Sequence, residues 1–358
     1  MKKTLCFVMI LLFGFAFQAM ADEPIGVFAN SNTNSLQFIN PITQAVSPSL
    51  LKGDLGSYGG GLFDVVISPN GKTAVVSNFG DSKLFFIDIS GGFAVAPTII
   101  GEAYIPFFAE DLAISPDGKW VLVTDGGFSS RVAAVNIETG VLVNNNTKSQ
   151  QAQAVTITAD GKTVITADYW NQAVHSYAFD TTTGIITYKD TAYISGLRPV
   201  NVVVSPDGKT ILVANAVGYT TAVITFWGDM KLHINGYFTL PTKTAQSVAF
   251  SKDGTKAYYL SSSYLFGANI VQVNVTAPGV VTVGATIPLS IPRGTSQLFG
   301  VDTLAIDPSG NYLYVTNPTL SGGVVEVTVI DLTTNTEVNQ LHGNGIPTGI
   351  AFGTIMAD

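Results

Sequence analysis

One unit recurs six times along the chain, and this repetition constrains the fold more than any other feature of the sequence. Each copy reads as an apolar strand, a tight turn such as Ser115-Pro116-Asp117-Gly118, and a second apolar strand. Proline presets the backbone at the second turn position, and Asp or Asn followed by Gly supplies the left-handed geometry of the reversal. Copies begin 43 to 56 residues apart, the length of a four-stranded blade. The copies span residues 63–78, 110–125, 153–168, 200–215, 246–261 and 302–317.

Two further strands follow each pair, as in residues 83–89 and 94–100. No segment shows helical periodicity, so the pattern predicts an all-β, seven-bladed propeller of four-stranded blades. The seventh blade is split between the two ends of the chain. Residues 348–352 match the first strand of the unit, and residues 25–30, 35–40 and 45–51 are expected to supply the other three. Pairing of the N- and C-terminal strands would then close the ring.

The first residues have the pattern of a secretory leader. Lys2 and Lys3 precede an apolar run over residues 5–17, and Ala19-Met20-Ala21 forms a cleavage signal. The apolar run is too short to span a bilayer, which needs about 20 residues. We therefore expect a signal peptide over residues 1–21 and a propeller over 22–358, located in the periplasm or secreted, with no insertion into a membrane.

Composition excludes several kinds of partner and chemistry. The net charge is −8 and no basic stripe exists, which argues against a nucleic acid partner. Cys6 is the only cysteine and lies within the leader, so the mature chain has no disulfide and no thiolate chemistry. Hydrophobic residues make up 46% of the chain and charged residues 12%, a balance typical of many short buried strands.

The strand ends carry a family likeness. Tyr314-Val315-Thr316-Asn317 is the tetrapeptide after which the YVTN family of propeller repeats is named, and residues 76–78, 213–215 and 28–30 are variants of it. The chain resembles this family over essentially its whole mature length. The resemblance implies a seven-bladed propeller. It does not fix a function, because relatives include surface-layer and adhesion-type proteins, periplasmic proteins of unclear role and seven-bladed lactonases.

One face of such a propeller is expected to carry the function. The turns between first and second strands are short and repetitive, whereas the loops of the opposite face are long and irregular, and binding sites usually lie on such loops. The arginines Arg131, Arg198 and Arg293 all map to the irregular face. Together with the loop residue Trp170 they are the predicted ligand-binding residues, because aromatic and arginine side chains often anchor recognition surfaces.

Four carboxylates stand at the starts of the predicted axial strands: Asp64, Glu110, Asp111 and Asp302. One interpretation is a cation site, because converging oxygen ligands suit calcium or magnesium. The other is that these groups are solvated or paired with the arginines. No Asp-x-Asp-x-Asp loop favours the metal. No cofactor is expected, apart from a calcium ion if the carboxylates do form a cation site.

Three further patterns have structural interpretations. Asn or Asp recurs at the end of the second strand, as in Asn78 and Asp168, where a short polar side chain can bond the next turn. Gly-Lys-Thr at residues 71–73, 161–163 and 208–210 imitates a phosphate-binding loop, but a strand follows where that loop needs a helix. His175, His233 and His342 fall on three different blades, which argues against a three-histidine zinc site.

These observations leave two main hypotheses. The first is a monomeric, non-catalytic scaffold that binds a protein, a glycan or a small anionic ligand on the irregular face. The second, implied by the likeness to seven-bladed lactonases, is a hydrolase of an anionic lactone at the axial mouth. There Arg198 and Arg293 would hold the substrate, with Glu110 or His175 as acid or base. A propeller stabilised by calcium alone is a third possibility.

Overall fold

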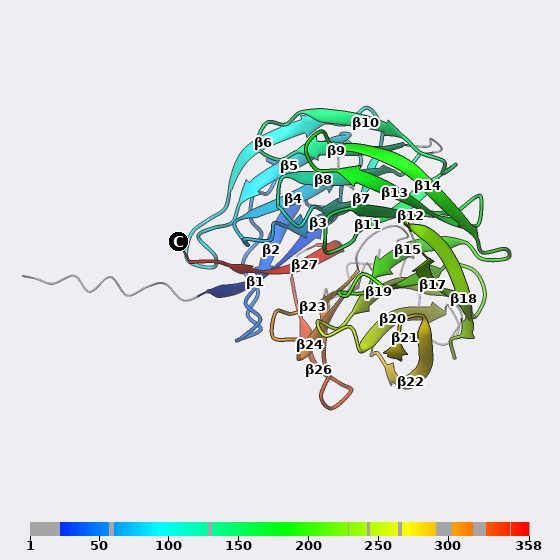
Figure 1. The fold of residues 1–358 in the computed structure, drawn as a ribbon. Helices are drawn as coiled ribbons and strands as arrows, with labels where there is room; N and C mark the ends of the chain where they lie inside the picture. The colour runs from blue at the N-terminus through cyan, green and yellow to red at the C-terminus, as the bar shows by residue number, and fades with distance from the viewer. Residues whose placement is uncertain are drawn as a thin grey trace, which may run out of the picture.

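The computed structural model describes residues 22–56, 61–127, 131–227, 229–241, 244–263, 267–290, 303–317, 327–343 and 345–357. These residues form strands and turns without a helix, and the strands make seven antiparallel sheets arranged as blades around a ring (Figure 1). The predicted seven-bladed, all-β propeller is confirmed. No helix in the described part of the chain is long and apolar enough to cross a membrane.

Blades one to three follow one another along the chain, each with its strands in sequence order from the axis outwards. Blade one contains β3 (Leu62–Ile67), β4 (Thr73–Asn78), β5 (Lys83–Asp88) and β6 (Thr98–Tyr104). Blade two contains β7 (Ala109–Ile114), β8 (Trp120–Asp125), β9 (Arg131–Asn136) and β10 (Leu142–Asn146). Blade three contains β11 (Ala152–Ile157), β12 (Thr163–Asp168), β13 (Ala173–Asp180) and β14 (Ile185–Tyr193).

Blades four to six repeat this order. Blade four contains β15 (Pro199–Val204), β16 (Thr210–Asn215), β17 (Thr220–Trp227) and β18 (Lys231–Thr239). Blade five contains β19 (Ala245–Phe250), β20 (Lys256–Ser263), β21 (Gly267–Ala277) and β22 (Val280–Pro288). Blade six contains β23 (Leu304–Ile306), β24 (Tyr312–Thr316), β25 (Val327–Asp331) and β26 (Thr336–Leu341).

Blade seven joins the two ends of the chain. It consists of β27 (Pro347–Ile355), β1 (Glu23–Asn30) and β2 (Ser35–Ile39), and β27 pairs with β1 from Glu23 opposite Ile355 to Asn30 opposite Pro347. Figure 1 shows the red C-terminal strand beside the blue β1. The predicted closure of the ring is therefore confirmed. The segment expected as the fourth strand, residues 45–51, forms no regular strand. It lies beside β2 through bridges at Val46 and Leu50 and through hydrogen bonds between Ser47 and Phe38.

The core lies between neighbouring blades. Strands near the axis are buried on both faces, whereas outer strands such as β18 alternate between exposed and half-buried residues. Most buried clusters combine residues of two adjacent sheets, as where Val75 and Leu84 of blade one pack with Leu112 and Val121 of blade two. Burial of these apolar faces drives the blades together.

In blades one to six, the turn between the first and second strands has the geometry that its sequence demands. The turn glycines all have φ between 70° and 76°, and each donates its N–H to the residue three positions earlier, as Gly118 does to Ser115. The strands β4, β12 and β16 begin at the threonines of the three Gly-Lys-Thr strings. These strings are therefore blade turns, as predicted.

Candidate functional site

The axial strands of blades one and two begin with a bulge. In β3 the register shifts between Leu62 and Val65, and the N–H of Asp64 is donated to the Ser77 hydroxyl at 2.9 Å. In β7 the N–H of Asp111 is likewise donated to Thr124 at 3.0 Å. The bulge re-aims the side chain at this position towards the next blade.

These re-aimed side chains link neighbouring blades. The N–H of Leu112 is donated to Asp64 Oδ2 at 3.0 Å, and the N–H of Val155 is donated to Asp111 Oδ2 at 2.7 Å. Asn201 of blade four makes the equivalent contact to blade five, because its Oδ1 accepts the N–H of Val248 at 3.3 Å. A carboxylate that accepts a buried N–H is a strong inter-blade contact.

The predicted cation site gains no ligand cluster from this arrangement. Asp64 and Asp111 are 0% and 1% exposed. They are buried between blades, whereas the sequence predicted them at the axial mouth. Among the described residues no group of three His, Cys, Asp or Glu side chains could hold a metal ion. Asp302 lies outside the described residues. A metal at the axis stays a prediction.

Glu110 is a buried acid near the start of the axial strand β7. It is 4% exposed, and its Oε1 accepts a hydrogen bond from Nε2 of Gln153 on the next blade. Its Oε2 is buried with no hydrogen-bond partner in the protein. Burial raises the pKa of Glu110 well above its usual value, and the nearby carboxylates of Asp125 and Asp64 raise it further. Glu110 is therefore held in its protonated form to a higher pH than an ordinary glutamate.

An aromatic stack lies beside this acid. The rings of Phe63 and Phe79 stack with centroids 5.3 Å apart, and those of Phe79 and Phe108 stack at 4.8 Å. A Cβ built on Gly126 would lie 2.6 Å from the Phe79 ring and 2.8 Å from Oε2 of Glu110. Glycine at 126 is thus required for the close approach of this loop to both groups.

Arg198 is held by two rings of the neighbouring blade. Its guanidinium carbon lies 5.0 Å from the ring centre of Tyr169 and 4.7 Å from that of Trp170. Its Nη1 is buried and has no hydrogen-bond partner in the protein. The structure thus brings together two of the predicted ligand-binding residues, Arg198 and Trp170, and adds Tyr169, which sequence reasoning missed.

Arg131, another of the predicted arginines, lies elsewhere. Arg131 is exposed at the start of β9, and its charge opposes the rise in the pKa of Asp125 that burial causes. Arg293 lies outside the described residues. No hydrogen bond or ion pair among the described residues joins Glu110 to His175 or to Arg198, so the four-residue catalytic grouping stays a prediction.

His175 belongs to a separate buried chain of polar groups in blade three. Its Nε2 lies 3.2 Å from Oδ2 of Asp168, and its Nδ1 lies 2.7 Å from Oγ1 of Thr191. Burial opposes ionisation of Asp168, but hydrogen bonds from His175, Asn171 and Gln150 outweigh it and lower the pKa of Asp168. With Asp168 ionised, the Nε2–H of His175 can be donated to it, which orients the ring within the blade.

The recurring Asn and Asp at the second-strand ends set the following turn. Asn78 and Asp125 accept the N–H of Asp81 and Gly127, each at 2.8 Å. Asp168 accepts the N–H of Asn171 at 3.1 Å. The structural interpretation of this column is confirmed at these positions.

The polar first positions of the repeat units could have been found from sequence. Glu110, Gln153 and Gln246 occupy equivalent places in three repeats, where Val200 and Phe63 are apolar in two others. Nε2 of Gln246, which is 6% exposed, is buried without a hydrogen-bond partner in the protein. Glu110, Gln246 and Arg198, on three different blades, therefore each have a buried hydrogen-bonding atom that no protein group satisfies.

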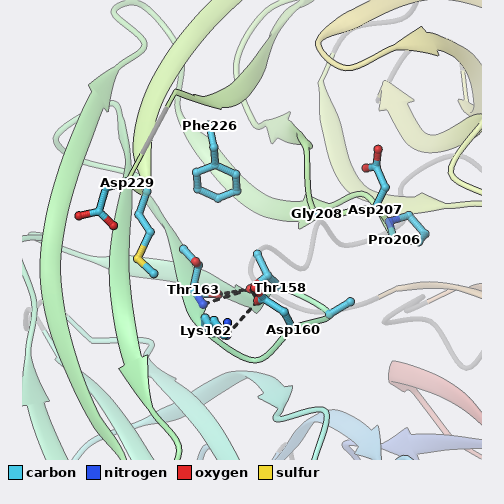
Figure 2. Close-up of a pocket in the computed structure, with 11 residues that line it drawn as sticks. Thr158, Asp160, Lys162, Thr163, Pro206, Asp207, Gly208, Phe226 and Asp229 are labelled. Atoms are coloured by element: carbon cyan, nitrogen blue, oxygen red, sulfur yellow. Dashed lines mark hydrogen bonds between the residues drawn. The ribbon is translucent and has the colours of Figure 1, made fainter.

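A separate cavity of about 610 Å³ lies on the opposite, regular face between the turns of blades three and four (Figure 2). It contains none of the residues predicted to form a site.

Comparison with known proteins supports the fold. No protein-family profile matches the sequence, and no curated protein matches it. A solved structure of a protein of unknown function from Desulfotomaculum acetoxidans has a TM-score of 0.77 at 16% identity, over 92% of this chain and 98% of that one. The periplasmic gluconolactonase of Pseudomonas aeruginosa has a TM-score of 0.72 at 15% identity, over 94% and 100%. A putative 6-phosphogluconolactonase from Bacteroides fragilis has a TM-score of 0.70 at 16% identity, over 92% and 98%.

These likenesses agree with the fold that the YVTN resemblance implies. At such identities the shared feature is the propeller itself.

Proposed function

We propose that the chain binds a small anionic, hydroxyl-rich ligand on its irregular face, at the axial mouth, without changing it chemically. Arg198 carries this proposal. Its guanidinium stacks on Tyr169 and Trp170, and its Nη1 is buried without a partner in the protein. A buried cationic donor is costly unless a counter-charge pairs with it. The planar fork of arginine matches a carboxylate or phosphate, which supplies that charge.

Two further groups support a ligand that also carries hydroxyls. Nε2 of Gln246 can donate a hydrogen bond, and Oε2 of Glu110 can donate or accept one according to its protonation. Hydroxyl groups satisfy both kinds of partner. A sugar acid combines a carboxylate with several hydroxyls, so it is the ligand class that fits these three residues.

Isothermal titration with gluconate tests the proposal. We expect Arg198→Ala to weaken binding by about tenfold or more. Arg198→Lys should weaken it as well, because a point charge replaces the stacked fork. Lys231→Ala removes the same charge from an exposed position on β18 and should leave binding unchanged. Failure of gluconate to bind, or equal binding by Arg198→Ala and the unmodified protein, would overturn the proposal.

Lactone hydrolysis is the second candidate. The observation that favours it is the raised pKa of Glu110, because a general acid must hold its proton at a higher pH than an ordinary glutamate does. The gluconolactonase among the similar structures gives a reason to test it. Turnover of glucono-lactone above its spontaneous rate, lost in Glu110→Gln, would replace the binding-only proposal. Gluconate binding without turnover would retain it.

The proposed location is the periplasm or the cell exterior, as the leader predicts. Mass spectrometry of the protein recovered from a bacterial host should show a chain that begins at Asp22. Recovery of the uncleaved chain from the cytoplasm would contradict export.

A further inference from the structure

The turns of the regular face touch one another around the ring through a repeated contact. A Cβ built on Gly118 would lie 3.4 Å from Cδ of Pro69, the turn proline of the preceding blade. The same packing joins Gly161 to Pro116 at 3.5 Å and Gly254 to Pro206 at 3.2 Å. The turn proline of one blade therefore covers the turn glycine of the next.

This proline is missing at two of the junctions between neighbouring turns, which we call seams. Blade three has Ala159 at the proline position, and a Cβ on Gly208 of blade four would meet nothing within 4 Å. Blade five has Lys252 there, and a Cβ on Gly310 of blade six would also meet nothing within 4 Å. A cavity of about 610 Å³ opens at the first seam and one of about 290 Å³ at the second. The missing proline explains where both cavities occur.

The larger cavity, here named the blade 3/4 groove, has the size of a small-molecule site. Thr158, Asp160, Lys162 and Thr163 line it from one blade, and Asp207 and Phe226 are among the residues that line it from the other. Figure 2 shows the Phe226 ring pointing towards the turn that carries Thr158 and Thr163. Phe226 is only partly buried and lines the groove, so its ring is available to an occupant.

The charges of the groove are balanced. Each aspartate lies near a lysine: Asp160 near Lys162, Asp207 near Lys209 at 3.8 Å, and Asp229 near Lys189 at 3.8 Å. A charged ligand would therefore be repelled by one member of each aspartate–lysine pair while it is attracted by the other. Hydroxyl groups, which both donate and accept, are suited to alternating carboxylates and ammonium groups.

We propose that the blade 3/4 groove binds a neutral carbohydrate. Its hydroxyls would bond Asp160, Lys162 and Asp207, and the C–H face of one sugar ring would lie against Phe226. Aromatic rings present a negative face that attracts polarised C–H groups, and Met230 extends the apolar wall. This site is separate from the axial mouth, since it lies on the opposite face and shares no residue with it.

Saturation-transfer NMR and isothermal titration with maltotriose, cellotriose and triacetylchitotriose, each at about 5 mM, test the proposal. We expect at least one trisaccharide to bind. Ala159→Pro should weaken that binding by about tenfold or more, because it restores the proline that closes the other seams. Phe226→Ala should weaken it comparably without any change in a turn.

Matched variants separate this groove from other sites. Lys252→Pro closes only the second seam, and Trp227→Ala removes an exposed ring next to Phe226 in sequence; both should bind the trisaccharide as the unmodified protein does. Arg198→Ala should also leave it unchanged, which distinguishes this site from the axial mouth. Absence of binding by all three sugars overturns the proposal. Unaltered binding in both Ala159→Pro and Phe226→Ala overturns it as well.

Discussion

The link from Asp111 to Val155 should be a large single contribution to the stability of the ring. Asp111 is 1% exposed, and its Oδ2 accepts the N–H of Val155 at 2.7 Å. Asp111→Ala would leave that N–H without its acceptor inside the protein. An unsatisfied buried donor costs about 1–3 kcal/mol, and a bond to a charged acceptor contributes about 1.5–3 kcal/mol. Removal of a buried charge offsets part of this, so we expect a net loss of about 2 kcal/mol in the free energy of unfolding.

Urea unfolding followed by far-UV circular dichroism measures this loss. Asp111→Asn keeps an acceptor oxygen, as Asn201 does at the same place in blade four, and should lose less than about 1 kcal/mol. Asn201→Ala, whose bond is longer and uncharged, should lose about 1 kcal/mol. Unchanged stability in Asp111→Ala would refute the reasoning. If Asp111→Asn lost as much as Asp111→Ala and added calcium stabilised only the unmodified protein, the carboxylate would act through an ion.

Three further predictions concern pH, turns and closure. The pKa of Glu110 is raised in the folded protein, so the native state keeps a proton that the unfolded chain releases once the pH exceeds the ordinary glutamate pKa of 4.5. The free energy of unfolding should therefore fall as the pH rises from 4.5 towards the raised pKa of Glu110. Glu110→Gln should remove that fall. If the urea midpoint changed equally between about pH 5 and pH 8 in both proteins, the prediction would be wrong. Ala159→Pro and Lys252→Pro should each add about 0.4–1 kcal/mol to the free energy of unfolding in a thermal-melt comparison, because both turns share the glycine φ and hydrogen bond of the proline-containing turns; a lower melting temperature would contradict this. Deletion of residues 345–358 removes β27 and should abolish the cooperative melt; a deletion variant that melts like the full chain would show that closure is dispensable.

The repeat pattern predicted the blades because each blade is specified locally. Apolar alternation and a Pro-Asp-Gly turn determine a hairpin without reference to distant residues. The outer segment at residues 45–51 had no such turn signal. Its bridges at Val46 and Leu50 depend on how the chain crosses to blade one, which the pattern does not encode.

The candidate site was less predictable because it depends on contacts between blades. Arg198 and Trp170 were selected separately from sequence, but their stacking follows from the position of one blade beside the next. The burial of Asp64 and Asp111 follows from bulges that re-aim their side chains. The blade 3/4 groove depends on Ala159. The effect of alanine at this position can be predicted only when its neighbours across the seam are known.

The pairing of β1 with β27 also fixes an order of events in folding. Every hairpin of blades one to six can form from residues close in sequence, whereas Glu23 meets Ile355 only after the intervening chain has been arranged. Bringing such distant segments together has an entropic cost that reaches about 5 kcal/mol for a flexible loop of this length. Until then, one edge of β1 has no partner, and an open strand edge can pair with another molecule. The rate at which the ring closes, more than the stability of any blade, should therefore determine how much of the newly made protein aggregates.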